Sequence, residues 1–447
     1  VYKLADIYLY HGRFKDAEAL GVKLTNWSHY AIEGLMLLIT CAANQGNRYL
    51  LLSRIKSVFP YVDTLKVSQF ETLFYYLIKL NEKELAQVLL DKRPEHLASA
   101  LTYDARLALA TNDATRAIKL LADSDDVRSN ANVLYLLGQA YHQHGDYSLA
   151  FQTLEKAAQL KSKTLKKVAS VNLVTLRKLL KNFQFKPSNN EASNFQHVFV
   201  CGFPRSGTTL IDNILETQEQ SYVLSEQPFI YLLKEYMRSE FNKQYPKDVN
   251  RLTDKECSEL RAMYFQLINQ IDAPTDKQNI IVDKSPHYIG YIPFILKVFP
   301  SAKFLISIRH PLDVCLSCHR VNFNVNSDTQ YLVSMKAIVE RYKEVFTFFE
   351  HLSEQVVFDY RVVKYEELVT NFDEAILEAL QYIGVEKPNA EYVNFHETAK
   401  QKFVSSASSN QTNQPLYSSS LFSWKNYADE IEEYIPALST MIEKWGY

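Results

Sequence analysis

The chain has 447 residues, of which 47% are hydrophobic and 22% charged, as in a globular protein with a sizeable core. Its net charge of −2 excludes binding to nucleic acid through an overall basic surface. The sequence contains no apolar stretch of about 18 residues, so we expect no membrane span. Five scattered cysteines form no disulfide framework, which predicts a reducing, cytoplasmic location.

Residues 1–185 show a helical pattern that repeats along the chain. In the clearest unit, from Leu134 to Ala158, small residues let two antiparallel helices approach and large residues fill the seam. Steps of roughly 30 to 34 residues match tetratricopeptide (TPR) repeats. The weaker copies lie at Ala5–Ala17, Gly46, Ala86 and Ala105–Ala117. The pattern predicts a TPR-like α-solenoid with a concave face, and an irregular helical array is the alternative.

The segment 186–195 interrupts this pattern. It contains a proline, two serines and three asparagines among ten residues, a composition typical of a linker. We therefore divide the chain into a helical domain of residues 1–185, this linker, and a second domain of residues 196–447.

Short apolar segments alternate with helical patterns in the second domain. The segments that indicate buried strands are 197–201, 221–225, 279–283, 303–308 and 361–365. Such alternation predicts an α/β fold, with a parallel sheet covered by helices on both faces. Ligands of these sheets bind at the carboxyl ends of the strands, so we look for the site there.

The loop Gly202-Phe-Pro-Arg-Ser-Gly-Thr-Thr209 follows the first predicted strand and begins a helix. Backbone N–H groups and the helix dipole favour an anion in this context. The spacing is that of a Walker A loop, but Thr208 replaces the lysine that bridges the β- and γ-phosphates of a nucleoside triphosphate. A shorter group, such as a 5′-phosphosulfate, suits the loop, and Arg205 can bind the same anion.

Arg309 directly follows the predicted strand 303–308, and Pro311 is typical of a helix start. Ser317 lies about two turns further along that helix, given the 3.6 residues of each turn. Arg309 and Ser317 can therefore converge on one phosphate.

Together the two segments resemble the sulfotransferases that use 3′-phosphoadenosine 5′-phosphosulfate (PAPS), and most closely the protein-tyrosine sulfotransferase branch. The resemblance extends over residues 196–447, and such enzymes often carry TPR repeats in front. It implies a P-loop-like α/β sulfotransferase domain with PAPS as co-substrate. A sulfuryl group carries less charge than a terminal phosphoryl group, and the sequence has no cluster of metal ligands, so we expect no metal.

The resemblance implies a donor-binding role for each matching residue. Those expected to hold the 5′-phosphosulfate are Arg205, Ser206, Gly207, Thr208 and Thr209. Arg309 and Ser317 would hold the 3′-phosphate, and Tyr365 would lie near the nucleotide. Ser408 would contact phosphate from a loop that covers the donor.

The resemblance also implies the catalytic residues. Glu226 would be the base that takes the acceptor proton, and Lys284 with Arg205 would neutralise charge on the bridging oxygen. Two positions depart from the family pattern. Ser423 stands where a basic residue often precedes the tryptophan, and His310 replaces acidic or amide residues. We expect His310 to be a surface residue.

The acceptor stays open at this point: a peptidyl tyrosine, a sugar hydroxyl or amine, or a small molecule. We expect a protein or peptide acceptor to be recruited by the TPR region, and a homodimer because relatives form dimers. Two other functions compete. A P-loop kinase or NTPase is disfavoured by the missing lysine and by the lack of an acidic Walker B residue. A TPR scaffold with an inactive domain is disfavoured by the joint presence of Arg205, Lys284 and Glu226.

Overall fold

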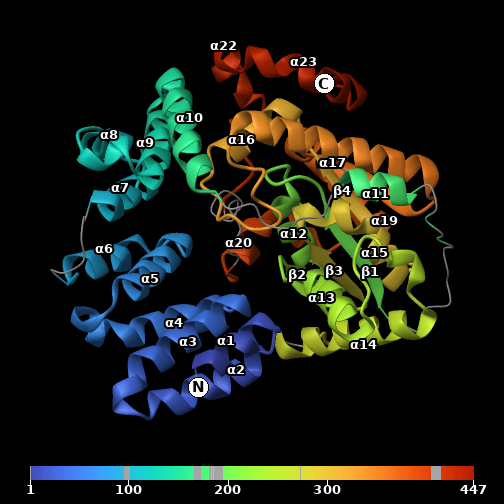
Figure 1. Ribbon diagram of the computed structural model, residues 1–447, viewed down its shortest axis with the longest axis horizontal. Coiled ribbons are helices and arrows are strands. Elements are labelled where there is room, and N and C mark those ends of the chain that lie inside the picture. The colour runs from blue at the N-terminus through green and yellow to red at the C-terminus, as the bar shows by residue number, and fades with distance from the viewer. Residues whose placement is uncertain are drawn as a thin grey trace.

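The computed structural model describes residues 2–94, 101–165, 173–180, 183, 185, 195–271, 273–403 and 414–447. A helical array forms one side of the molecule, and a sheet with its covering helices forms the other (Figure 1). Within the described residues, no helix combines the length and the apolar character needed to cross a membrane.

The described helices of the array follow one another with short turns between most of them. They are α1 (Tyr2–Tyr10), α2 (Phe14–Thr25), α3 (Ala31–Asn44), α4 (Arg48–Val58), α5 (Val67–Lys79), α6 (Lys83–Asp91), α7 (Leu101–Ala110), α8 (Ala114–Ala122), α9 (Ala131–His144) and α10 (Tyr147–Thr164). Consecutive helices such as α2 with α3 and α9 with α10 pack side by side. The expectation of a helical N-terminal region is confirmed, whereas its assignment to the TPR class stays a prediction.

Small residues allow this close packing. A Cβ atom on Gly138 of α9 would lie 2.7 Å from Leu154 Cγ of α10, which is nearer than real carbon contacts allow. A side chain at Gly138 would therefore push α9 and α10 apart.

The sheet contains five parallel strands in the order β2-β3-β1-β4-β5. They are β1 (Gln196–Cys201), β2 (Ser221–Ser225), β3 (Ile280–Lys284), β4 (Lys303–Ile308) and β5 (Asp359–Lys364). The predicted parallel sheet is confirmed, with ends that differ by one or two residues. The largest shift is in β5, which starts at Asp359 because Asp359 and Tyr360 pair with Lys303 and Phe304 of β4.

Helices cover both faces of this sheet. They are α11 (Leu173–Leu180), α12 (Thr208–Glu216), α13 (Phe229–Phe241), α14 (Asp254–Ile271), α15 (Ile292–Val298), α16 (Pro311–His319), α17 (Met335–Gln355), α18 (Tyr365–Thr370), α19 (Phe372–Ile383), α20 (Phe395–Ala399), α22 (Ala428–Ile431) and α23 (Ile435–Lys444). Because side chains alternate along a strand, Val198 and Val200 of β1 join the core formed with α12 and α19. Phe199 and Cys201 join the core formed with α13 to α17.

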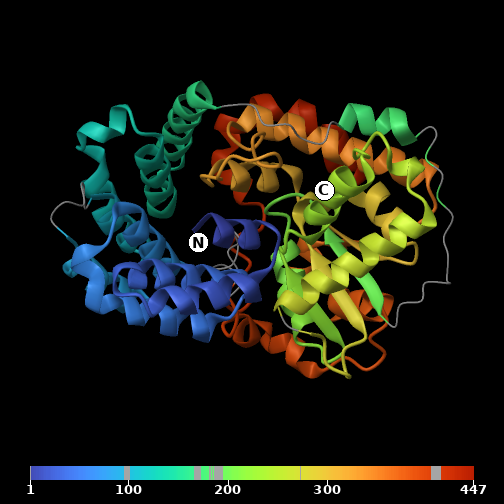
Figure 2. The same cartoon turned by 60° about the horizontal axis from the view of Figure 1, so that its bottom comes forward.

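The array contacts the α/β half at both of its ends (Figure 2). Near its start, Lys15 of α2 donates a hydrogen bond to the backbone oxygen of Asn269 in α14 at 2.7 Å. Near its end, the Tyr135 hydroxyl of α9 donates to the backbone oxygen of Val333 at 3.2 Å.

The domain boundaries at 185 and 196 stay predictions. Of the expected linker 186–195, only Phe195 lies within the described residues. Helix α11 falls inside residues 1–185 but packs against α17 of the α/β half, where Leu173 and Leu176 are buried.

Candidate active site

The loop between β1 and α12 can be built only with glycine at its two ends. A Cβ on Gly202 would lie 2.6 Å from the backbone oxygen of Ser307 in β4. Gly207 has φ 107°, and its Cβ would lie 2.7 Å from the Tyr365 ring. Both positions therefore bring the backbone closer to its neighbours than a side chain permits. Helix α12 begins directly after this loop, and the N-terminus of a helix favours an anion through its backbone dipoles.

Ser206 stabilises this loop through two hydrogen bonds. Its hydroxyl accepts a hydrogen bond from the Phe203 N–H at 3.3 Å, and its backbone oxygen accepts one from Ser307 Oγ at 2.9 Å. Ser206 is fully buried, and Thr208 is nearly so. Among the predicted loop residues, Arg205, Gly207 and Thr209 line an open pocket, while the side chains of Ser206 and Thr208 are not part of its lining.

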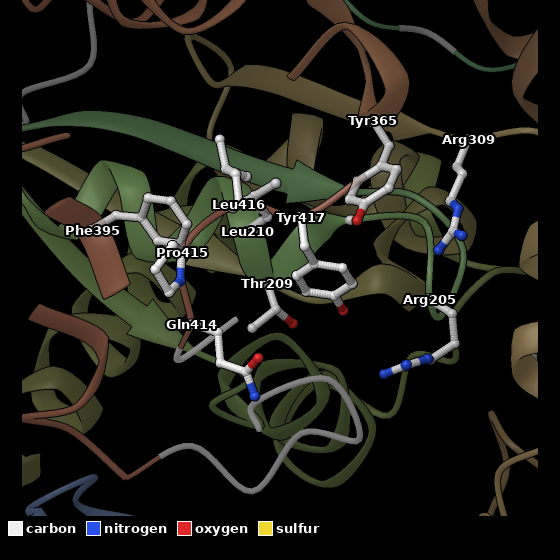
Figure 3. Close-up of a pocket in the computed structure, with 11 residues that line it drawn as sticks. Arg205, Thr209, Leu210, Arg309, Tyr365, Phe395, Gln414, Pro415, Leu416 and Tyr417 are labelled. Atoms are coloured by element: carbon white, nitrogen blue, oxygen red, sulfur yellow. The ribbon is translucent and has the colours of Figure 1, made fainter. Parts of the chain in front are cut away.

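The pocket gathers predicted residues from three places in the chain (Figure 3). Arg205 and Thr209 come from the loop, Arg309 follows β4, and Tyr365 begins α18. The remaining lining residues are Leu210, Phe395, Gln414, Pro415, Leu416 and Tyr417. Ser408 lies outside the described residues, but the end of the expected donor-covering loop, Gln414–Tyr417, does line the pocket.

Arg205 and Ser317 meet across this site. The Arg205 Nε donates a hydrogen bond to Ser317 Oγ at 3.0 Å. Burial lowers the pKa of Arg205 to about 10, and the positive charges of Arg320 and Arg309 act in the same direction. Cationic groups that destabilise one another in the free protein favour the binding of an anion.

Arg309 is 7% exposed and makes contacts of three kinds. Its guanidinium lies 4.7 Å from the centre of the Tyr365 ring, and it lies 3.6 Å from the Asp313 carboxylate. It also donates a hydrogen bond to the backbone oxygen of Ser420. Its Nε is buried and has no hydrogen-bond partner among the described residues. An unmet donor on a buried cation fits a site for an anionic ligand.

A second cluster lies at the carboxyl ends of β2 and β3. The Lys284 side chain is fully buried, with its Nζ 2.7 Å from Glu226 Oε1 and 3.7 Å from Asp212 Oδ2. Burial alone would lower the pKa of Lys284, but the Glu226 and Asp212 carboxylates outweigh it and raise that pKa. Lys284 is therefore a protonated ammonium at physiological pH.

The backbone at Glu226 is strained. Its φ is 54°, in the left-handed region that side chains disfavour, and its N–H donates to the backbone oxygen of Lys284 at 3.1 Å. The Glu226 side chain is 32% exposed, whereas Asp212 and Lys284 are buried. Of these three charged groups, Glu226 is thus the one that is accessible from solvent. Strained residues of this kind cluster at active sites.

Asp212 is a site residue that the sequence reasoning missed. It lies on α12 and accepts a hydrogen bond from Ser225 Oγ at 2.6 Å. Burial raises its pKa, an effect that the charge of Lys284 opposes. Its only signal in the sequence is an acidic residue within the apolar helix that follows the loop.

His310 corrects one expectation, because it is 4% exposed rather than a surface residue. Its ring stacks on Trp424 at 5.1 Å, and burial lowers its pKa to about 4. The side chain of Ser423 donates a hydrogen bond to Asp313 Oδ1 at 3.0 Å. His310 and Ser423, the two positions that depart from the family pattern, therefore contact neighbouring side chains in this part of the fold.

In the described ranges, no three His, Cys, Asp or Glu side chains are grouped as a metal site.

Comparison with known proteins finds similarity in the second half of the chain. Residues 197–389 match the model of the sulfotransferase family. An uncharacterized protein of Aquifex aeolicus is 24% identical over 351 residues, which are 75% of this chain and 45% of that protein. Protein-tyrosine sulfotransferase 1 of Danio rerio is 27% identical over 119 residues, which are 25% of this chain and 32% of that protein. The matched regions thus span less than half of either relative.

Solved structures give more distant matches. The sulfotransferase domain from the Synechococcus PCC 7002 olefin synthase aligns with a TM-score of 0.38 and 18% identity, covering 54% of this chain and 91% of that one. Sulfotransferase STF9 from Mycobacterium avium aligns with a TM-score of 0.37 and 14% identity, covering 78% of this chain and 97% of that one.

Proposed function

We propose that this protein is a PAPS-dependent sulfotransferase that transfers a sulfuryl group to a hydroxyl or amine acceptor. The observation that carries the proposal is the Lys284–Glu226 ion pair of 2.7 Å beside the anion-binding loop. Parallel strands β1, β2 and β3 end at the same edge of the sheet, which brings the loop, the ammonium and the carboxylate together.

PAPS carries two anionic groups, the 5′-phosphosulfate and the 3′-phosphate, on one nucleoside. Each of them has cationic or N–H groups to bind it at this edge of the sheet. The loop N–H groups and Arg205 suit the 5′-phosphosulfate, since charge-assisted hydrogen bonds favour such oxyanions. The unmet Nε of Arg309 suits the 3′-phosphate. Ser317 Oγ accepts a hydrogen bond from Arg205 Nε at 3.0 Å, so its own O–H is left to donate to that phosphate. Tyr365 supplies an aromatic wall for the nucleoside.

The reaction is an in-line displacement at sulfur. The acceptor oxygen forms a bond to sulfur as the bond from sulfur to the phosphate oxygen breaks, which releases 3′-phosphoadenosine 5′-phosphate. Glu226 takes the acceptor proton, and its partial exposure gives the acceptor access to the carboxylate. Lys284 and Arg205 stabilise the negative charge that develops on the departing phosphate oxygen.

The competing functions fit the site less well. A kinase or NTPase needs a loop lysine and a strand-end carboxylate, and this chain has Thr208 and Arg309 at those positions. An inactive scaffold has no need of the strained Glu226 backbone or of a fully buried lysine paired to it.

The proposal extends to the acceptor, the binding partners and the cellular location. We infer a peptidyl tyrosine among the candidate acceptors, a peptide bound by the TPR-like region, and a homodimer. All five cysteines are buried free thiols, which supports a reducing, cytoplasmic setting.

A transfer assay with radiolabelled PAPS tests the proposed function. The purified chain is incubated separately with tyrosine-containing peptides, with glycans and with a cell extract, and labelled products are counted. We expect labelled product with at least one acceptor class and none from the Lys284→Ala variant. Absence of transfer to all three, together with no binding of 3′-phosphoadenosine 5′-phosphate, contradicts the proposal.

A further inference from the structure

Glu226 lies in the short turn 226–228 between β2 and α13. Ser225, the residue before it, pairs with Lys284 in the sheet, and α13 begins at the buried Phe229. Both ends of the turn are therefore fixed. The φ of 54° at Glu226 is disfavoured for any residue with a side chain, and such a backbone persists only where its surroundings hold it.

Gln227, the next residue, caps the carboxyl end of α3. Its Nε2 donates a hydrogen bond to the backbone oxygen of Asn44, the last residue of that helix, at 2.9 Å. The last four carbonyl groups of a helix have no partner within it. Those of residues 41–43 accept hydrogen bonds from the backbone N–H groups of the turn 45–47. The Gln227 amide satisfies the fourth, and it thereby ties the residue next to Glu226 to the helical array.

The turn after α3 is held by a second segment of the α/β half. The backbone oxygen of Gly46 accepts a hydrogen bond from the Phe403 N–H at 2.9 Å, and Phe403 is buried in one core cluster with side chains of α4 and α5. Lys402, the preceding residue, places its Nζ 2.5 Å from Glu216 Oε1 at the end of α12. The array is therefore also tied to the helix that carries Asp212.

The array thus contacts two elements that carry charged groups of the proposed site. One is the turn with Glu226, and the other is α12 with Asp212. Both carboxylates face the same ammonium, since Lys284 Nζ lies 2.7 Å from Glu226 and 3.7 Å from Asp212. The position of the array relative to the sheet is therefore coupled to the geometry of this cluster.

We propose that Gln227 is a positioning residue, and that its hydrogen bond to α3 keeps Glu226 in the left-handed conformation in which it pairs with Lys284. This inference rests on the proposed function. Without the hydrogen bond, the Glu226 backbone relaxes toward more favourable values of φ and ψ, which moves the carboxylate from its place 2.7 Å from Lys284. Gln227 acts through Glu226 and takes no part in bond formation or proton transfer. The helical array is then a component of the active site, in addition to any role in binding an acceptor.

The test compares variants of the whole chain. Gln227→Met keeps the length of the side chain but has no N–H donor, and Gln227→Asn keeps the amide on a shorter side chain. Gln139→Met is the matched control, because Gln139 of α9 donates to the backbone oxygen of Arg320 at 3.0 Å and so also joins the array to the α/β half. For each variant, kcat and acceptor KM are measured with labelled PAPS, and the Kd of 3′-phosphoadenosine 5′-phosphate is measured by calorimetry.

We expect both changes at Gln227 to lower kcat by roughly 10- to 100-fold, because a displaced catalytic group loses most of its effect. The acceptor KM and the nucleotide Kd should stay near wild-type values, and Gln139→Met should keep the wild-type kcat. Gln227→Met should cause little further loss when it is added to Glu226→Gln. A residue that acts through the base has no effect once the base is gone, whereas independent effects add.

The outcomes separate this inference from the proposed function. Wild-type kcat in either Gln227 variant overturns the positioning role and leaves the sulfotransferase proposal standing. An additive loss in the double variant, an equal loss in Gln139→Met, or a parallel loss of nucleotide affinity in Gln227→Met assigns the effect to general structure, which also overturns that role. Failure of the wild-type chain to bind the nucleotide or to transfer sulfuryl overturns the proposed function, and this inference with it.

Discussion

Replacement of Glu226 by glutamine tests the chemistry of the site most directly. Glutamine keeps the size and the hydrogen-bonding reach of the side chain but cannot accept a proton. Lys284 loses the charge of the carboxylate at 2.7 Å yet keeps the Asp212 carboxylate at 3.7 Å, so the buried ammonium is not left without a counter-charge. The fold should therefore survive the change, and donor affinity should be nearly unaffected.

The expected loss is in turnover. A positioned base contributes about 10² to 10⁴ in rate, which is roughly 2.7 to 5.4 kcal/mol of transition-state stabilisation. The assay is transfer from labelled PAPS to a hydroxyl acceptor at pH 7, with calorimetry of 3′-phosphoadenosine 5′-phosphate binding on the same preparations. Glu219→Gln is the control, because that carboxylate is 65% exposed and pairs with the surface residue Lys277.

A glutamine variant as active as the wild type on that acceptor refutes Glu226 as the base. Acceptor ionisation supplies a second check. With an acceptor that ionises within the pH range tested, the loss should shrink as pH rises, because an acceptor that is already deprotonated needs no base. A loss that is independent of pH for such an acceptor also contradicts the assignment.

Three other predictions concern binding and stability. Arg309→Ala should weaken the binding of 3′-phosphoadenosine 5′-phosphate by about 1.5–3 kcal/mol and that of adenosine 5′-phosphate much less, by calorimetry, and equal weakening contradicts a contact with the 3′-phosphate. The wild type should bind 3′-phosphoadenosine 5′-phosphate more tightly than ATP, and equal or tighter ATP binding contradicts the donor assignment. Burial raises the pKa of Asp283 from 3.8 to about 7, so the carboxyl stabilises the fold below its ordinary pKa and loses this contribution as pH rises through about 7. Relative to Asp283→Asn, the wild-type unfolding free energy should therefore fall between those two pH values in denaturant titrations, and parallel pH curves contradict the shift.

The elements that could be predicted are those with a local signal. The strands are short apolar runs, and the loop from Gly202 to Thr209 has glycine where the backbone allows nothing larger. Arg205 and Arg309 were expected at one edge because they follow strands of one parallel sheet, and Tyr365 was expected there from the family resemblance. The structure brings all three into one pocket.

The missed features depend on contacts between distant segments. Nothing in the sequence around Asp212 shows that Lys284 lies 3.7 Å away, since α12 and β3 are separated by two helices and a strand. His310 was expected at the surface because its stacking partner, Trp424, comes more than a hundred residues later. The contact of Gln227 with Asn44 likewise joins two regions that the repeat pattern treats separately.

The attachment of the first helices of the array to the α/β half has a consequence for biosynthesis. Lys15 meets Asn269, which is 254 positions later in the chain, and Asn44 meets Gln227, which is 183 positions later. A ribosome that adds about 5–20 residues each second needs on the order of ten seconds or more to supply those partners. During that interval the first helices are made, but the surface that they later cover has not yet been synthesised. Their inner face is then open to solvent, and final closure of the molecule waits for the sheet, as expected for contacts of such long sequence separation.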